Sequence, residues 1–144
     1  MKALSIHPQY AMAIAAGEKT IEVRSWNTNY RGTIVICSTN KLLNGTIPGH
    51  ALCTVELIDV VPLKREHLKD AMLNARDFKK GLFAWVLDDN RMIKPTPVKG
   101  KLGLWNYTGE TEYIPFEEWV QEDGRDESSY HWYEDYWLPI TTGK

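Results

Sequence analysis

The sequence of 144 residues lacks the features that mark several large classes of protein. No stretch approaches the ~18 consecutive apolar residues that a membrane-spanning helix requires. The sequence also contains no internal repeat and no low-complexity linker. The phosphate-binding GxxxxGK loop, the metalloprotease HExxH helix and the hydrolase GxSxG turn are also missing. We therefore expect one globular domain with no membrane partner, and the sequence offers no support for a P-loop nucleotidase, a metalloprotease or an α/β-hydrolase.

Cysteine is scarce as well. Cys37 and Cys53 are the only two, and they have neither the CxxC spacing nor the neighbouring histidines of a zinc site. We predict no metal and no other cofactor. The first residues resemble a signal peptide in part, but residues 7–9 (HPQ) interrupt the apolar stretch and no clean cleavage site follows. We therefore expect a cytoplasmic protein in which both cysteines are buried free thiols.

Charged and aromatic residues are distributed unevenly. Residues 1–108 hold fifteen Lys or Arg and nine Asp or Glu, whereas residues 109–144 hold two and ten. The acidic part also contains eight of the sixteen aromatic residues, and disordered acidic tails are poor in such residues. We predict a basic domain over 1–108 and an acidic, aromatic-rich extension over 109–144 that packs on it. Within the extension, a short helix is expected at 116–120 and a loop at 124–129.

The alternation of apolar and polar residues predicts a series of short strands. They are expected at residues 2–6, 20–24, 33–38, 51–61 and 102–107. The strand at 51–61 is long enough to bend around a barrel.

Helices are expected in two places. Pro8 suits the first turn of a helix, and Gly17 is suited to end it. Residues 64–77 have amphipathic spacing, with a basic polar face that is either simply solvated or a track for phosphates. Residues 82–98 predict a hairpin that turns at 88–90. This mixed order disfavours a doubly wound parallel sheet, and we predict an α+β fold, a small, partly closed β-barrel with two or three flanking helices.

The most specific group of polar residues lies in the turn that connects the first predicted helix to the second predicted strand and in that strand. Gly17, Lys19, Glu22 and Arg24 follow the pattern GxKxxExR. Strand periodicity puts Glu22 and Arg24 on one face, with Lys19 in the preceding turn. The cations can neutralise a phosphate, while Glu22 accepts hydrogen bonds from an exocyclic amine of a base. The same pattern also fits a surface strand with an ordinary Glu–Arg pair.

This motif and its flanks resemble the ASCH family of the PUA-like superfamily. GxKxxExR matches the family motif as it stands, and four flanking segments are similar to the family: LSIHPQYA (4–11), SW (25–26), RGTIVI (31–36) and PVKGKLGLW (97–105). The resemblance covers roughly residues 3–107. It implies a PUA-like barrel with a cleft beside the first helix, lined by the motif, and RNA or a nucleotide-like molecule as the ligand.

The resemblance also raises an enzymatic alternative. The family includes a coactivator-associated domain that contacts nucleic acid, a ribonuclease, and an amidohydrolase that deacetylates cytidine acetylated on its exocyclic amine. In that amidohydrolase the motif lysine works with a threonine nucleophile and a glutamate. Here Lys19 matches the lysine, but Glu22 occupies the threonine's place. If the chain is an enzyme, these two residues are its candidate catalytic residues, because a desolvated lysine beside an arginine loses basicity.

Five further residues are candidate ligand contacts. His7 can act as a base or stack on a nucleobase at the rim of the cleft, or simply be a rim residue. Trp26 can be a stacking platform or can close the barrel. Ser38, Thr39 and Lys41 leave a core strand near the expected cleft, where they either contact phosphate or cap a loop.

Three functional hypotheses follow. The leading one is a binding module that recognises RNA or a nucleotide through Lys19, Glu22 and Arg24. The second is a hydrolase acting on RNA or on a modified nucleoside, which a hydroxyl about 3 Å from the Lys19 amine would favour. The third is a protein-interaction domain that works through the acidic extension. In that extension, Glu134 or Asp135 would be placed to screen the basic cleft from other polyanions.

Overall fold

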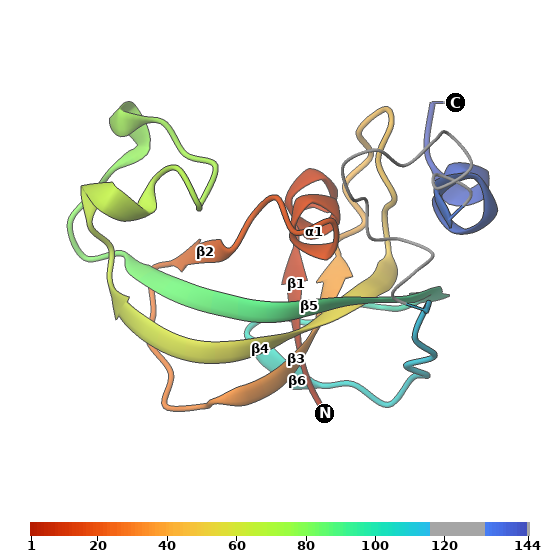
Figure 1. Cartoon of the computed structure of the whole chain (residues 1–144), viewed down its shortest axis with the longest axis horizontal. Helices are drawn as coiled ribbons and strands as arrows, with labels where there is room; N and C mark the ends of the chain where they lie inside the picture. Colours follow the sequence, from red (N-terminus) through yellow and green to blue (C-terminus); the bar gives the residue numbers. More distant parts are fainter. Residues whose placement is uncertain (116–131, 144) are drawn as a thin grey trace.

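A computed structural model describes residues 1–115 and 132–143 (Figure 1). Six strands form one curled sheet in the order β2-β5-β4-β3-β1-β6. They are β1 (Lys2–Ile6), β2 (Ile21–Arg24), β3 (Gly32–Ser38), β4 (His50–Pro62), β5 (Phe83–Pro97) and β6 (Leu104–Asn106). Neighbouring strands are antiparallel except β1 and β3, which run parallel. The predicted α+β fold with a partly closed barrel is confirmed.

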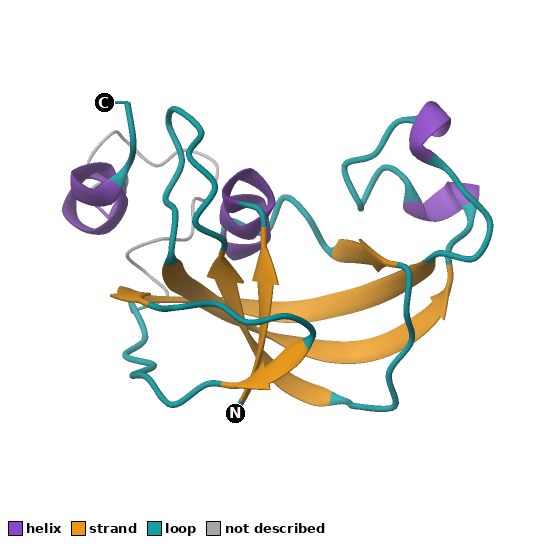
Figure 2. Ribbon diagram, turned by 180° about the vertical axis from the view of Figure 1, so that it is seen from behind, coloured by secondary structure: helices purple, strands orange, loops and turns teal. Residues whose placement is uncertain are grey.

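Helix α1 (Pro8–Ala15) lies on the concave side of the sheet (Figure 1). The remaining helical turns are short: η1 (Arg65–His67), η2 (Ala75–Asp77), η4 (Tyr133–Trp137) and η5 (Leu138–Ile140). Figure 2 shows η1 and η2 at one end of the sheet and the C-terminal turns at the other. The buried side of α1, which includes Ala11, Ile14 and Ala15, packs into the main core with residues from β1, β3, β4 and β5.

The helix predicted over 64–77 is wrong. Only the two short turns η1 and η2 form there, because the backbone is engaged elsewhere. The carbonyl of Asp70 accepts the backbone N–H groups of Thr20 and Ile21 at 3.0 and 3.2 Å, so it is not available to a following helical turn. Met72 then adopts a left-handed φ of 57°, a conformation that ends a right-handed helix. The segment serves instead as a brace for the start of β2.

The hairpin predicted over 82–98 is also wrong, since these residues form the single strand β5. Asp88 and Arg91 pair with β4 residues that are two apart, so β5 carries one extra residue at this point. Asp89 has a left-handed φ of 49° there. The sequence signal for a turn therefore marks a β-bulge, which lets a long strand bend around the barrel.

The described part of the acidic extension contacts the barrel. Tyr113 forms an isolated antiparallel β-bridge with Ile93. Trp132 and Trp137 are buried in the main core and pack edge to face, with ring centroids 5.1 Å apart. The helix and loop predicted between residues 116 and 129 lie outside the described residues.

Two other expectations concern the interior and the membrane. Cys37 and Cys53 are free and buried, as predicted. Burial raises the pKa of the Cys37 thiol to about 12 and raises that of Cys53 as well, so both are unreactive thiols. Within the described residues, every helix is too short or too polar to cross a membrane.

Candidate functional site

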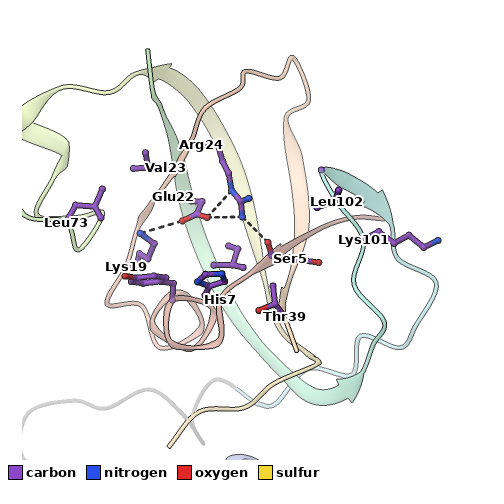
Figure 3. Close-up of a pocket in the computed structure, with 13 residues that line it drawn as sticks. Ser5, His7, Lys19, Glu22, Val23, Arg24, Thr39, Leu73, Lys101 and Leu102 are labelled. Carbon is purple, nitrogen blue, oxygen red and sulfur yellow. Dashed lines mark hydrogen bonds and ion pairs between the residues drawn. The ribbon is translucent and has the colours of Figure 1, made fainter. Parts of the chain in front are cut away.

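A pocket of about 430 Å³ opens beside helix α1 (Figure 3). Its walls come from the end of β1, the start of α1, the turn and strand that carry the motif, and three loops. The first loop follows β3, the second joins η1 to η2, and the third precedes β6. Small-molecule sites span roughly 300–1,000 Å³, so this pocket has room for one nucleotide-sized group rather than for a long segment of polymer.

The floor of the pocket is a cluster of three charged side chains, two buried and one partly exposed, which we call the motif cluster (Lys19, Glu22 and Arg24). Lys19 is 3% exposed and Glu22 is 7% exposed. The Lys19 Nζ donates to the carbonyl oxygen of Ala71 and lies 3.6 Å from Glu22 Oε1. Arg24 approaches the other oxygen, with Nε and Nη2 at 3.1 and 3.0 Å from Glu22 Oε2. Its Nη2 also donates to the Ser5 carbonyl at 2.9 Å, so one carboxylate holds two cations in place.

Local backbone chemistry explains how the motif cluster is assembled. Gly17 has a φ of 84°, which lets the chain reverse directly after α1. The Lys19 backbone N–H then donates to the Ala13 carbonyl at 3.2 Å, and β2 begins two residues later. Glu22 and Arg24 share one face of β2, as the strand periodicity predicts. Gly17 itself does not line this pocket but a separate cavity of about 50 Å³.

Burial changes the acid–base character of Lys19. Desolvation lowers the pKa of its ammonium below the ordinary value of 10.5, the Glu22 carboxylate opposes this change, and Arg24 adds a smaller lowering. The ammonium also lies 5.3 Å from the centroid of the Tyr10 ring, where a cation is favoured. A lysine in this setting can bind an anion or transfer a proton.

Two of the other predicted contacts line the pocket. His7 lies at the rim, where β1 passes into α1. Thr39 contributes a hydroxyl oxygen that is buried and has no hydrogen-bond partner among the described residues. Buried polar atoms are nearly always satisfied, so this hydroxyl is an exception among the buried polar atoms of the described residues.

Three predicted contacts lie outside the lining of the pocket. Trp26 packs edge to face on Trp85, with ring centroids 4.7 Å apart, and helps to close the barrel. The Ser38 hydroxyl caps the loop between β3 and β4 through the backbone of His50, accepting its N–H at 3.0 Å. Lys41 is exposed on the same loop. Of the two alternatives given for each residue, loop capping therefore describes Ser38, and barrel closing describes Trp26.

Sequence reasoning missed part of the pocket lining. Ser5 supplies the carbonyl that holds Arg24, and Leu73, Lys101 and Leu102 come from loops distant in sequence. The sequence of residues 97–105 resembles the family, but it did not predict that this segment lies at the pocket. That position follows from the pairing of β6 with β1. No group of three His, Cys, Asp or Glu side chains within residues 1–115 and 132–143 is arranged to hold a metal ion.

Comparisons with known proteins assign the chain to a family. The family model of the ASCH domain matches residues 4–140, and the chain therefore belongs to the ASCH domain family. The match extends beyond the segments quoted above into the acidic extension. A search of curated proteins gave no significant match.

Similar solved structures come from Zymomonas mobilis. The ASCH crystal structure from this organism is 19% identical over 74% of this chain and 87% of that chain, with a TM-score of 0.59. A variant of that protein with one serine changed to alanine gives the same identity and TM-score and covers 88% of that chain. A tyrosine-to-phenylalanine variant is 21% identical over 67% of this chain and 74% of that chain, with a TM-score of 0.54. At these identities the likeness concerns the fold.

Proposed function

We propose that this ASCH domain binds RNA by holding one nucleotide unit in the pocket above the motif cluster. The observation that carries the proposal is the buried arrangement of one carboxylate between two cations. Ionised groups are expensive to bury, and here they are gathered on the floor of a pocket that is open to solvent.

The charge of the pocket favours an anion. With Lys19 protonated, the motif cluster carries a net charge of one positive unit, and among the described residues that line the pocket Glu22 is the only acidic one. Arg24 is a quarter exposed at its side chain. Its Nη1 has no partner within the described part of the chain, so it remains available to donate to a phosphate oxygen.

The remaining lining suits a base and sugar. The ring of Tyr10 and the imidazole of His7 border the pocket and offer flat faces on which a base can stack. The Oε1 atom of Glu22 can accept from an exocyclic amine, and the unpartnered Thr39 hydroxyl can bond a sugar or phosphate oxygen. A nucleotide therefore finds a partner here for each of its chemical parts.

A titration with matched variants tests this function. Ribonucleoside monophosphates and short RNA are titrated into the wild type, Arg24→Ala and Lys41→Ala by calorimetry at several salt concentrations. We expect Arg24→Ala to weaken binding at least about tenfold, whereas Lys41→Ala, outside the pocket, changes affinity less than about twofold. Affinity should fall as salt rises. Binding that is independent of salt, or that is intact in Arg24→Ala, contradicts the proposal.

A hydrolase in the same pocket is the second candidate. It is favoured by the lowered pKa of the Lys19 ammonium beside a carboxylate. The hydrolase hypothesis needs a hydroxyl nucleophile that Lys19 can activate. Within the described residues no hydroxyl is hydrogen-bonded to the Lys19 Nζ, which contacts Ala71 and Glu22 instead. We expect weak or absent hydrolysis of cytidine acetylated on its exocyclic amine and of RNA. Robust turnover that disappears in Lys19→Ala would make the protein an enzyme.

A further inference from the structure

The loop between β5 and β6 presents an unusual pair of side chains at the mouth of the pocket. Leu102 is 99% exposed, and Lys101 stands beside it. Both line the pocket on the side opposite Lys19 (Figure 3). A fully exposed leucine at the mouth of a pocket keeps apolar surface in contact with water. A bound molecule that covers this surface gains free energy.

This rim loop (residues 98–103) is anchored to the floor of the pocket. A Cβ on Gly100 would lie only 2.7 Å from the Ser5 hydroxyl oxygen, so the loop backbone packs directly on Ser5. The same hydroxyl accepts the Trp105 indole N–H at 3.1 Å, and the Ser5 carbonyl holds Arg24. Ser5 therefore contacts the backbone of the rim loop at Gly100, the side chain of Trp105 in β6, and Arg24 of the motif cluster.

The charge of the rim loop is positive, and no carboxylate among the described residues pairs with it. Lys99 and Lys101 are exposed, and neither forms an ion pair with a carboxylate among the described residues. The sequence contains no acidic residue between Asp89 and Glu110. Lys101 extends away from the motif cluster (Figure 3), so its ammonium lies outside the floor of the pocket.

We propose that the rim loop binds the nucleotide next to the one held in the pocket, with Leu102 covering a face of its base and Lys101 pairing with its phosphate. This inference rests on the proposed function and specifies its ligand: a chain of RNA rather than a free nucleotide. Arg24 and Lys101 would then hold successive phosphates, one inside the pocket and one outside it.

The test compares ligand lengths. A ribonucleoside monophosphate and a mixed-sequence ribotrinucleotide are titrated into the wild type, Leu102→Ser, Lys101→Ala and the control Lys80→Ala, an exposed lysine outside the pocket lining. In the wild type the trinucleotide should bind more tightly on the order of tenfold. Leu102→Ser should remove most of this ratio. Lys101→Ala should reduce the salt dependence of trinucleotide binding by about 0.7 in the log–log slope, and Lys80→Ala should alter neither.

The outcomes separate this inference from the proposed function. A wild type that binds neither ligand, or binds both independently of Arg24, contradicts the proposed function itself. A wild type that binds the monophosphate through Arg24 but gains nothing from added length contradicts only the rim-loop inference. So does a length effect that persists in both rim variants or that is lost in Lys80→Ala. Because Lys101 and Leu102 are exposed, their substitutions leave the core intact.

Discussion

The floor and the rim of the pocket use charge in opposite ways. On the floor, Lys19 and Glu22 are buried, and with Arg24 they bond to one another and to two backbone carbonyls. On the rim, Lys101 and Leu102 stand in solvent with no partner among the described residues. A buried cluster is fixed in geometry before any ligand arrives, whereas an exposed side chain acts only once something reaches it.

This difference assigns separate tasks to the two regions. Desolvated charges must be paired to be tolerated, and their fixed positions give selectivity for a ligand of matching shape. Exposed charges contribute little to stability but steer polyanions and add affinity that depends on salt. Substitutions on the floor should therefore change stability and binding together, whereas those on the rim should change binding alone.

The largest effect is expected from Glu22→Gln, which leaves two cations without their carboxylate. We expect the free energy of unfolding to fall by about 3–5 kcal/mol, as when one partner of a buried pair is removed. Urea denaturation measures this loss. The matched control is Glu112→Gln, which breaks the exposed 2.7 Å pair with Lys94 and should cost less than about 1 kcal/mol. Similar losses in the two variants would erase the contrast between floor and surface.

Arg24→Lys keeps the charge of the floor but not its geometry. A lysine cannot contact Glu22, the Ser5 carbonyl and a phosphate at once as the planar guanidinium can. We expect nucleotide affinity to fall by about tenfold, measured by calorimetry against the wild type. If Arg24→Lys binds as tightly as the wild type, charge alone is sufficient and the fixed geometry is unimportant.

Thr39→Val tests a residue between the two regions. Its hydroxyl oxygen is buried without a partner among the described residues, so removing it should leave the free energy of unfolding unchanged or raise it by up to about 1 kcal/mol. Nucleotide affinity should fall, because the hydroxyl is a proposed contact of the nucleotide. A variant that loses stability and keeps full affinity would instead give Thr39 a structural role.

The smallest effect concerns pH. The pKa of Lys19 is lowered in the folded protein from 10.5, so above the folded pKa the unfolded chain binds more protons. Stability should therefore rise with pH through the folded pKa and level off near pH 10.5. This rise should be missing in Lys19→Met, measured by urea unfolding at alkaline pH. If the stability of the wild type and of Lys19→Met rises equally with pH, Lys19 titrates like an exposed lysine and the prediction is wrong.

Sequence patterns predicted the elements that depend on local chemistry. Pro8 and Gly17 bound the first helix as predicted, and the alternation in β2 put Glu22 and Arg24 on one face. The burial of Glu22 did not follow from the sequence, because a lone strand of this pattern has one polar, solvated face. In the fold, Lys19 and Arg24 lie against its two carboxylate oxygens, and the segment around Asp70 and Ala71 packs at the start of β2.

Contacts between distant segments explain the remaining errors. Helical spacing over 64–77 is overridden by hydrogen bonds that the Asp70 carbonyl accepts from the N–H groups of Thr20 and Ile21, which no local pattern reveals. The rim loop reaches the pocket only because β6 pairs with β1 about a hundred residues earlier. For Ser38, residue type favours loop capping only slightly over ligand contact, and for Trp26 it leaves stacking and barrel closing equally open, so only their neighbours distinguish the alternatives.

The central claim, that a nucleotide binds above the motif cluster, is tested most directly by mapping where it binds. Backbone amide NMR chemical shifts are followed while a ribonucleoside monophosphate is titrated into the wild-type protein. The account predicts that the largest changes fall on Ser5, Glu22, Arg24 and Thr39, and that Arg24→Ala suppresses them. Changes concentrated instead on the basic surface of residues 64–80, with the motif cluster unaffected, would contradict it.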